Sequence, residues 1–326
     1  MEFSKAVLSI DAERVATEIE GFIRDTVKNY FKRKGIVIGL SGGIDSTVAA
    51  ALSVRALGQK RVHGLILPER DSNPKSREYG IKTAESLGIE YTEYDITSAL
   101  EGLGVYEKRD AVVGKYFPDL AGNYAFRLTL PQDLLERDRI NVYHLEVKSE
   151  NGSLLTARLS HDDYLEMMAA NDIKQRMRMI HLYYEAERRY CIVCGTTNKA
   201  ETQQGFFVKF GDGGVDIEPL APLYKSQVYQ LGRYLGAPEE VLARTPSPDT
   251  YSFEVSDKDF YFCIPYDTVD LILYAMEHGV SIEETSEALD IEIESLKRAW
   301  RDLERKRDAT EPLRSLPPIP QLSSLD

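Results

Sequence analysis

The sequence predicts an α/β fold built on a parallel sheet, with an antiparallel insertion and a helical C-terminal part. Short patterns typical of buried strands alternate with helical patterns up to about residue 96, a spacing that indicates βαβ units. Two segments with period-two alternation follow near the middle of the chain, and helical patterns dominate thereafter. The length of 326 residues suits one α/β domain with an elaboration, so we expect residues 1–326 to form a single domain.

The first part of the chain alternates helices and strands. In order, we expect a helix at 12–33, a strand at 36–40, a helix at about 46–57, a strand at 62–67, a helix at 74–87 and a strand at 91–96. The first helix carries an apolar stripe from Val15 to Tyr30, with polar residues on the opposite face. Gly35 ends that helix, and the first buried strand follows it directly.

The middle of the chain breaks this rhythm. Between residues 106 and 160, turn signals separate two alternating segments, 140–148 and 153–159. Asn151-Gly152 joins them, and Asn-Gly between alternating apolar residues is a strong hairpin signal. We therefore interpret 106–160 as an insertion that carries a β-hairpin.

A long helix, a fourth strand and a helical C-terminal part complete the prediction. The expected elements are a helix at 163–190, a strand at 190–195 that ends in a loop at 196–201, and helices at 224–235, 268–277, 281–289 and 293–307. The last segment, 308–326, is rich in proline and is expected to form an extended tail.

Composition excludes several classes of protein. The formal net charge of −13 argues against a nucleic-acid partner, because such proteins concentrate Lys and Arg on one face. The longest apolar runs are far shorter than the roughly 20 residues of a transmembrane helix. The N-terminus shows no secretory signal, and three cysteines fit a reducing compartment. We expect a cytoplasmic protein with neither nucleic-acid nor membrane partners.

A glycine-rich turn lies where the first predicted strand meets the second predicted helix. It consists of Gly39, Leu40, Ser41, Gly42, Gly43, Ile44, Asp45 and Ser46. Adjacent glycines let the backbone approach an anion without a Cβ in the way, and the free amides that begin a helix bind phosphate. Asp45 would repel a bare phosphate, but a magnesium ion takes carboxylate and phosphate oxygens together. The turn therefore predicts a site for a nucleotide and its metal.

This string has a plainer interpretation as an ordinary helix cap, in which Ser and Asp are common. It lacks the Gly-Lys-Ser/Thr of the Walker motif. It resembles the pyrophosphate loop of the ATP-pyrophosphatases, which cleave ATP between the α- and β-phosphates. That resemblance implies a Rossmann-like sheet of the adenine-nucleotide alpha-hydrolase type. The class includes amide-forming ligases, tRNA-thiolating enzymes and nucleotide amidotransferases, and the loop alone does not select among them.

The segment after the fourth predicted strand narrows the choice. Thr196 and Glu201 follow that strand, and a Gly-rich stretch containing Lys209 leads to Lys225. Because ligands bind at the carboxyl ends of parallel strands, this segment can face the phosphate loop. Glu201 then shares the metal with Asp45, Thr196 contacts the nucleotide, and the two lysines supply cations for the phosphates. A glycine-rich surface loop with scattered charges is the plainer interpretation.

Taken together, these residues resemble the ammonia-dependent NAD synthetase family over about residues 35–249. The resemblance implies that residues 39–46, Thr196, Lys225 and Ser247 contact ATP and that Asp45 and Glu201 hold magnesium. It implies contacts to deamido-NAD from Arg176, Lys209, Asp216 and a basic C-terminal motif, for which Arg305-Lys306-Arg307 is the nearest candidate. It also implies a homodimer with substrate bound near the interface.

One family motif falls on the long predicted helix. Residues 171–179 resemble Asn-Ile-Lys-x-Arg-x-Arg-Met, with Asp172 where Asn is usual. Arg176 and Arg178 lie about 200° apart on a helix and do not share a face. We assign Arg176 to the ligand and a structural role to Arg178. The insertion and the C-terminal half depart from the family pattern, which leaves open a carboxylic acid substrate other than deamido-NAD.

The resemblance implies a two-step reaction. A carboxylate attacks the α-phosphorus of ATP to give an acyl-adenylate and pyrophosphate, and ammonia then displaces AMP to leave an amide. Asp45, Asp216 and Lys225 are the expected catalytic residues, with Asp216 either orienting ammonia or taking its proton. The residues before the first strand leave no room for a glutaminase domain, so free ammonia or a separate glutaminase chain is the expected nitrogen source.

Other interpretations compete with this one. A tRNA-modifying enzyme calls for a basic face and loop cysteines, which the sequence lacks, and a nucleotide sensor has no need of Asp45 together with Glu201. Cys191 and Cys194 have the spacing of a metal pair, but residues three apart in a strand point to opposite faces. We expect both sulfurs to pack in the core. The aromatic run at 251–266 is expected to pack near the pocket or at a dimer contact.

Overall fold

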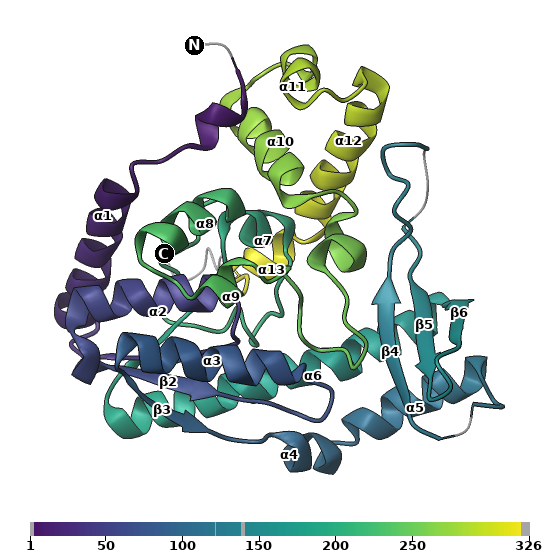
Figure 1. Ribbon diagram of the computed structural model, residues 1–326, viewed down its shortest axis with the longest axis horizontal. Helices are drawn as coiled ribbons and strands as arrows, with labels where there is room; N and C mark the ends of the chain where they lie inside the picture. The colour runs from purple at the N-terminus through teal and green to yellow at the C-terminus, as the bar shows by residue number, and fades with distance from the viewer. Residues whose placement is uncertain (1–2, 121, 138–140, 321–326) are drawn as a thin grey trace.

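The computed structural model describes residues 3–120, 122–137 and 141–320. Its central element is a four-stranded sheet in the order β3-β2-β1-β7 (Figure 1). The strands are β1 (Ile36–Gly39), β2 (Val62–Ile66), β3 (Glu90–Glu93) and β7 (Ile192–Cys194). All of their pairings are parallel, which confirms the predicted α/β fold.

The topology of this sheet fixes the position of the site. Ile36 of β1 pairs with Val62 on one side and with Ile192 on the other. The chain moves outward from β1 through β2 to β3 and later returns to place β7 on the opposite side. In such sheets, ligands bind outside the carboxyl ends of the strands where the order reverses. The segments that follow Gly39 and Cys194 lie at this position.

Helices cover both faces of the sheet. One face carries α1 (Ala12–Asp25), α2 (Ile44–Leu57), α3 (Pro74–Leu87) and α8 (Lys225–Tyr234), and the other carries α4 (Thr97–Gly102), α5 (Val105–Tyr116) and α6 (His161–Arg189). In Figure 1, α6 passes behind the strands. Side chains alternate along β1, so Ile36 and Ile38 face one core while Val37 faces the other.

The predicted elements of the first half are confirmed with small shifts at their ends. The first helix continues through a π-helical turn, Thr26–Tyr30, before the chain enters β1. Cys194 is buried in the core beneath α2, whereas Cys191 packs against the core on the opposite face. The prediction that these two sulfurs do not form a pair is therefore confirmed.

A three-stranded antiparallel sheet lies beyond one edge of the parallel sheet (Figure 1). Its strands are β4 (Tyr124–Thr129), β5 (His144–Ser149) and β6 (Leu154–Arg158). β5 and β6 form the predicted hairpin, and Gly152 at its turn has a φ of +84°. Residue 140, the first of the predicted segment 140–148, lies outside the described residues.

The segment 106–160 begins with a helix that we did not predict. α5 occupies its first residues, and α4 precedes it. The helical signal was present, since Val105 and Tyr106 recur with Val112 and Val113 at intervals of seven, one face of a helix. Flanking glycines at 102 and 104 hid it. β4 was also not predicted.

Helices dominate the C-terminal part, as expected. They are α9 (Glu239–Leu242), the π-helical turn Lys258–Phe262, α10 (Tyr266–His278), α11 (Ile282–Leu289), α12 (Ile293–Ala309) and α13 (Glu311–Arg314). The expected extended tail at 308–326 is wrong for its first residues, because α12 and α13 continue through 314. Proline suits the first turn of a helix, and Pro312 lies there in α13. Within the described residues, no helix combines the length and the apolar character needed to cross a membrane.

Candidate active site

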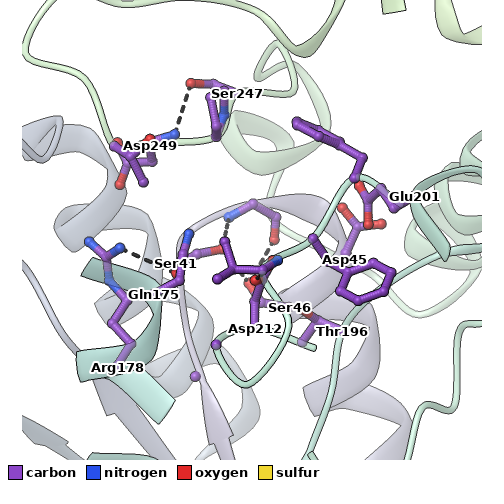
Figure 2. A pocket seen from close by; sticks show the side chains of 18 of the residues that line it. Ser41, Asp45, Ser46, Gln175, Arg178, Thr196, Glu201, Asp212, Ser247 and Asp249 are labelled. Carbon is purple, nitrogen blue, oxygen red and sulfur yellow. Dashed lines mark hydrogen bonds between the residues drawn. The ribbon is translucent and has the colours of Figure 1, made fainter. Parts of the chain in front are cut away.

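A pocket of about 610 Å³ opens at the carboxyl ends of β1 and β7. The phosphate loop at 39–46, the segment after β7, the middle of α6 and the segment 244–250 form its walls. Figure 2 shows Ser41, Ser46 and Thr196 at its centre, with Asp45 and Glu201 together on one side. The structure therefore brings the two predicted loops to one cavity.

The phosphate loop has the geometry of an anion site. Leu40 N–H donates to Leu65 O at 2.7 Å and closes β1, after which Gly42 turns the chain with a φ of +71°. Gly43 precedes α2, and no side chain caps the first amides of that helix. Ser41 and Ser46 lie with their hydroxyl oxygens 3.1 Å apart beside the turn. Uncapped amides at a helix N-terminus, with hydroxyls beside them, suit an oxyanion.

Gly42 is required here by close packing as well as by its dihedral angle. A Cβ at this position would lie 2.5 Å from Ser76 O and 2.9 Å from Tyr79 Cβ, both in α3. A side chain would push the loop away from α3. The loop thus owes its position to the absence of a side chain at residue 42.

Two carboxylates and one ammonium form the charged centre of the pocket. Lys225 Nζ lies 2.5 Å from Asp45 Oδ2 and 3.3 Å from Glu201 Oε1. Asn198 Nδ2 donates to Asp45 Oδ1 at 3.2 Å and holds that carboxylate in place. Both acids therefore contact the same cation, the ammonium of Lys225.

Glu201 occupies a helix rather than the predicted loop. It lies in the first turn of α7 (Lys199–Gln204), where Asn198 and Glu201 form a capping box. The Asn198 N–H donates to Glu201 Oε2 at 3.1 Å, and Glu201 N–H donates to Asn198 Oδ1 at 3.1 Å. These reciprocal bonds satisfy helix amides and fix the rotamer of the carboxylate.

Asp270 fixes the position of Lys225. Its carboxylate, fully buried in α10, accepts hydrogen bonds from Ser226 N at 2.8 Å and from Lys225 N at 3.4 Å. Burial raises the pKa of Asp270 to about 6. A carboxylate at a helix N-terminus pairs with free amides and with the helix dipole. The start of α8 is thereby anchored, and the Lys225 side chain is aimed at Asp45.

Burial controls the protonation of this centre. Burial acts to lower the pKa of Lys225, but the carboxylates of Asp45 and Glu201 outweigh it and hold that pKa above its ordinary value. Burial raises the pKa of Glu201 to about 8, and the charge of Asp45 adds to the rise although Lys225 opposes it. The charged centre thus places two carboxyl groups against one ammonium group, which favours binding of a further cation between them.

Four other predicted residues, Thr196, Ser247, Arg176 and Lys209, also line the pocket. Arg176 Nε donates weakly to Lys209 O at 3.4 Å, and Lys209 Nζ donates to Pro312 O at 2.8 Å. The C-terminal residues after α12 therefore pack against the side of the pocket that holds Lys209.

Two predicted residues lie off the pocket wall. Asp216 accepts hydrogen bonds from Val193 N at 2.7 Å and from Tyr183 Oη at 3.2 Å. Lys306 donates to Tyr261 O at 2.6 Å and pairs with Asp302 at 2.8 Å. The structure shows both residues in supporting contacts and does not bring either to the cavity.

Arg178 lines the pocket together with Arg176, so the purely structural role expected for it is incomplete. Arg178 Nε donates to Leu67 O at 3.2 Å, which holds the end of β2. The two arginines do point differently on α6, but the pocket wraps around the helix and reaches both. Helix periodicity correctly predicted the different directions of the two side chains, but it could not predict the shape of the cavity.

Three residues of the site were not found from the sequence: Arg244, Asp257 and Asp270. Neither Asp257 nor Asp270 belongs to a motif that we recognised. Asp270 bonds to Ser226, 44 residues away along the chain, and Asp257 bonds to Tyr266, 9 residues away. Arg244 stands three residues before Ser247, and that proximity was its only signal. Arg244 Nη1 lies 3.4 Å from Ser41 O and 3.3 Å from Gly42 O, and Nη2 donates to Ser76 Oγ at 2.6 Å.

We expect Arg244→Ala to raise the KM for ATP by about 10- to 100-fold, because carbonyls of the phosphate loop lose a charged donor that orients their peptide planes. Steady-state kinetics with varied ATP measures this effect, and added guanidinium is expected to restore part of the affinity. Arg55→Ala is the control, since Arg55 lies on α2 and pairs with Glu20 away from the pocket. An equal loss in both variants would contradict this account.

The donor set suits a hard divalent cation only in part. Among the described residues, no cluster of three or more His, Cys, Asp or Glu side chains is arranged around one metal position. Asp45 and Glu201 provide two carboxylates, so phosphate oxygens and water must supply the remaining ligands. Magnesium binds in this manner, through one or two carboxylates together with substrate phosphates.

The strand order, the phosphate loop and the adjacent carboxylate pair are typical of nucleotide-binding α/β proteins. Comparison with known families is consistent with this class, since the family model described as NAD synthase matches residues 15–116 and 128–309. The chain belongs to the NAD synthase family. The match extends beyond the expected 35–249 and covers most of the segment 106–160, of which only residues 117–127 fall outside it.

Individual relatives agree with this placement. The chain is 42% identical over 319 residues to an NH(3)-dependent NAD(+) synthetase of Rhizobium meliloti, covering 98% of this chain and 95% of the relative. It is 37% identical over 287 residues to the protein of the same name from Thermotoga maritima, covering 88% and 94%. A solved NH3-dependent NAD synthetase from Campylobacter jejuni shares the fold, with a TM-score of 0.62, 23% identity and coverage of 96% and 100%.

Proposed function

We propose that this chain is an ATP-dependent amide-forming ligase that converts deamido-NAD and ammonia to NAD, with release of AMP and pyrophosphate. The observation that carries this proposal is the phosphate loop opening onto the Asp45–Lys225–Glu201 centre in a member of the NAD synthase family. Relatives that match nearly the whole chain are named for this reaction. The alternative of a different carboxylic acid substrate has no support among these names.

The ATP side of the reaction is assigned to the phosphate loop and Lys225. The amides at the start of α2 and the hydroxyls of Ser41 and Ser46 face the triphosphate. Thr196 and Ser247 lie on the walls where they reach the nucleoside. Lys225 stabilises the negative charge that grows on the phosphates as the carboxylate attacks the α-phosphorus.

The metal assignment is Mg²⁺ between Asp45 and Glu201. When bound, Mg²⁺ supplies charge neutralisation to the phosphates and favours pyrophosphate as a leaving group. The convergence of both carboxylates on Lys225 Nζ and the raised pKa of Glu201 support this assignment. Asn198 orients both carboxylates before any ligand arrives.

The acid substrate is assigned to the side of the pocket that carries Arg176 and Lys209. Both residues carry positive charge next to the phosphate loop, and deamido-NAD is an anion with two phosphates of its own. Lys209 now donates to the carbonyls of Pro312 and Ser315, so substrate binding exchanges these neutral acceptors for charged ones. Asp216 and Lys306 fit roles as supports, for β7 and for the turn containing Tyr261.

The raised pKa of Glu201 predicts how stability depends on pH. Its pKa rises from 4.5 unfolded to about 8 folded, so the folded protein holds a proton that the unfolded chain releases. Without metal, this group makes stability fall as pH rises between those values. Magnesium competes with that proton, so the rise in Tm caused by magnesium is expected to grow from about pH 6 to about pH 9. Thermal unfolding with and without magnesium at each pH measures this rise in Tm. The Glu201→Gln variant should show a rise in Tm that does not depend on pH.

The proposed reaction is tested by incubating the protein with ATP, magnesium, ammonium and deamido-NAD. We expect NAD, AMP and pyrophosphate in equal amounts, and none of them without ATP. Glutamine in place of ammonium distinguishes the nitrogen sources, because free ammonia, or ammonia from a separate glutaminase chain, is the proposed donor. Pyrophosphate release with other carboxylic acids but not with deamido-NAD would overturn the proposal.

We propose that the chain acts as one NAD-synthetase-like domain and as a homodimer. Exposed apolar side chains on α6 support self-association: Leu165 is 49% exposed, Ile180 is 53% exposed and Tyr184 is 57% exposed. These positions recur on one side of the helix, where a second copy would cover them. Sedimentation equilibrium tests this, and a monomer at all concentrations would contradict it.

A further inference from the structure

A buried carboxylate beside Lys225 has no role in the assignments above. Asp257 is 4% exposed and belongs to the pocket wall. Its N–H donates to Pro246 O at 3.0 Å and ties together the ends of the segment 246–257. Its Oδ2 accepts a hydrogen bond from Tyr266 Oη at 2.9 Å. The backbone and one carboxylate oxygen of Asp257 are thus fixed in place.

The other oxygen, Oδ1, is buried without a partner. No residue within the described part of the chain donates a hydrogen bond to it. Tyr266, which holds the opposite oxygen, is itself fixed by contact with Phe262 at 4.9 Å between ring centroids. A buried polar atom left unpaired costs about 1–3 kcal/mol, and more when it is charged. This oxygen therefore calls for a donor or a cation during function.

The surrounding charges favour a cation. Lys225 contacts Asp45 and Glu201 directly, and the charge of Asp257 also helps to hold the pKa of Lys225 above its ordinary value. Three carboxylates thus face one ammonium group. Magnesium held by Asp45 and Glu201 would still leave Oδ1 of Asp257, a residue that lines the pocket, without a hydrogen-bond partner among the described residues.

We propose that Asp257 Oδ1 binds the ammonium ion that supplies nitrogen to the reaction and accepts one of its protons, so that the resulting ammonia attacks the acyl-adenylate and AMP leaves. This inference rests on the proposed function and names a subsite for its second substrate. Ammonium is small enough for a single buried oxygen, carries N–H donors and is the main form of ammonia at neutral pH. Phe260 and Tyr261 also line the pocket, and aromatic faces favour a cation. The subsite lies beside the charged centre at which the acyl-adenylate must form.

The test replaces Asp257 with Asn, which keeps the shape of the side chain and an acceptor for Tyr266 but removes the charge. We expect the KM for ammonium to rise by about 10- to 100-fold, because the variant loses one charge-assisted hydrogen bond to the ion. The KM values for ATP and deamido-NAD should stay within about twofold of wild type. Pyrophosphate formation in a single turnover without ammonium should also persist, because adenylation precedes the use of nitrogen.

Hydroxylamine separates a substrate-binding role from a structural one. It attacks acyl-adenylates as ammonia does, but it is largely uncharged at neutral pH and gains little from a carboxylate. We expect Asp257→Asn to lose ammonium-dependent turnover while keeping hydroxamate formation from hydroxylamine near the wild-type rate. Equal loss of both reactions, or a shift in the magnesium requirement instead, would overturn the inference.

Asp259→Asn is the matched control, since Asp259 lies two residues away and pairs with Ser256 rather than lining the pocket. It should leave the KM for ammonium unchanged. If Asp257→Asn does not fold, Tyr266→Phe is the second variant, because it removes the donor to Oδ2. It should raise the KM for ammonium several-fold, and an unchanged KM would overturn the inference.

The two proposals fail in different ways. Failure of the wild type to make NAD would reject the proposed function. Normal NAD synthesis with an unchanged KM for ammonium in Asp257→Asn would reject only this subsite.

Discussion

Replacing Lys225 with methionine is expected to lower the rate of NAD formation by about 100- to 1,000-fold, with a smaller effect on the KM for deamido-NAD. The ammonium of Lys225 is buried and aimed at the carboxylates that frame the phosphate loop. A preorganised donor of this kind acts most strongly on charge that develops in the transition state, and removal of one typically costs that factor. The rate of pyrophosphate release at saturating substrate concentrations, compared between Lys225→Met and the wild type, measures this loss.

The same variant has a distinct effect on stability. Without Lys225, Asp45 and Glu201 lose their buried counter-ion, which costs about 3–5 kcal/mol when one partner of a buried pair is removed. Magnesium restores a cation between them, so it should raise the Tm of Lys225→Met more than that of the wild type. Lys199→Met is the control, because Lys199 pairs with Glu277 outside the pocket. A magnesium effect equal in all three proteins would contradict the proposed metal position.

Gly42→Ala is expected to raise the KM for ATP by about 10- to 1,000-fold, the cost of misplacing one to three amide–phosphate hydrogen bonds. The backbone at residue 42 has a φ of +71°, and a Cβ would meet Ser76 O at 2.5 Å. The loop must therefore move away from α3, and its amides must turn from the phosphates. Isothermal titration with a non-hydrolysable ATP analogue measures the lost affinity.

Gly58→Ala separates backbone strain from displacement of the loop. Gly58 ends α2 with a φ of +89°, and nothing lies within 4 Å of the position of an added Cβ. Both variants carry a conformational cost of about 1–3 kcal/mol and should lower the Tm. Only Gly42→Ala should lose ATP affinity. Equal affinities in the two variants would show that the loop does not bind the triphosphate.

Local signals were sufficient to predict the parallel sheet and the phosphate loop. Strand–turn–helix order, glycine spacing and the Asn-Gly hairpin signal all act over a few residues, and each predicted the observed element. α5 was missed because glycines on its N-terminal side resembled turn signals, and α13 because proline was interpreted as a sign of extended chain. In both cases a local helical signal was present, and the neighbouring glycines or proline were given more weight than that signal.

The site was only partly predictable, for a reason of geometry. Asp45, Glu201 and Lys225 follow recognisable motifs, and the structure brings all three together. Asp270 acts through Ser226, 44 residues away along the chain, and the bond between Tyr266 and Asp257 follows no motif that we recognised, so no local pattern identified either carboxylate. The resemblance predicted substrate contacts for Asp216 and Lys306, but both residues lie off the pocket wall, which a motif cannot reveal.

The central claim is that the phosphate loop holds the triphosphate while Asp45 and Glu201 share a divalent cation against it. A crystal structure with a non-hydrolysable ATP analogue and manganese, located by its anomalous scattering, tests this most directly. We expect one metal peak bound by both carboxylates and by phosphate oxygens, with the phosphates on the amides that begin α2. A metal bound elsewhere, or a triphosphate away from residues 39–46, would contradict the account.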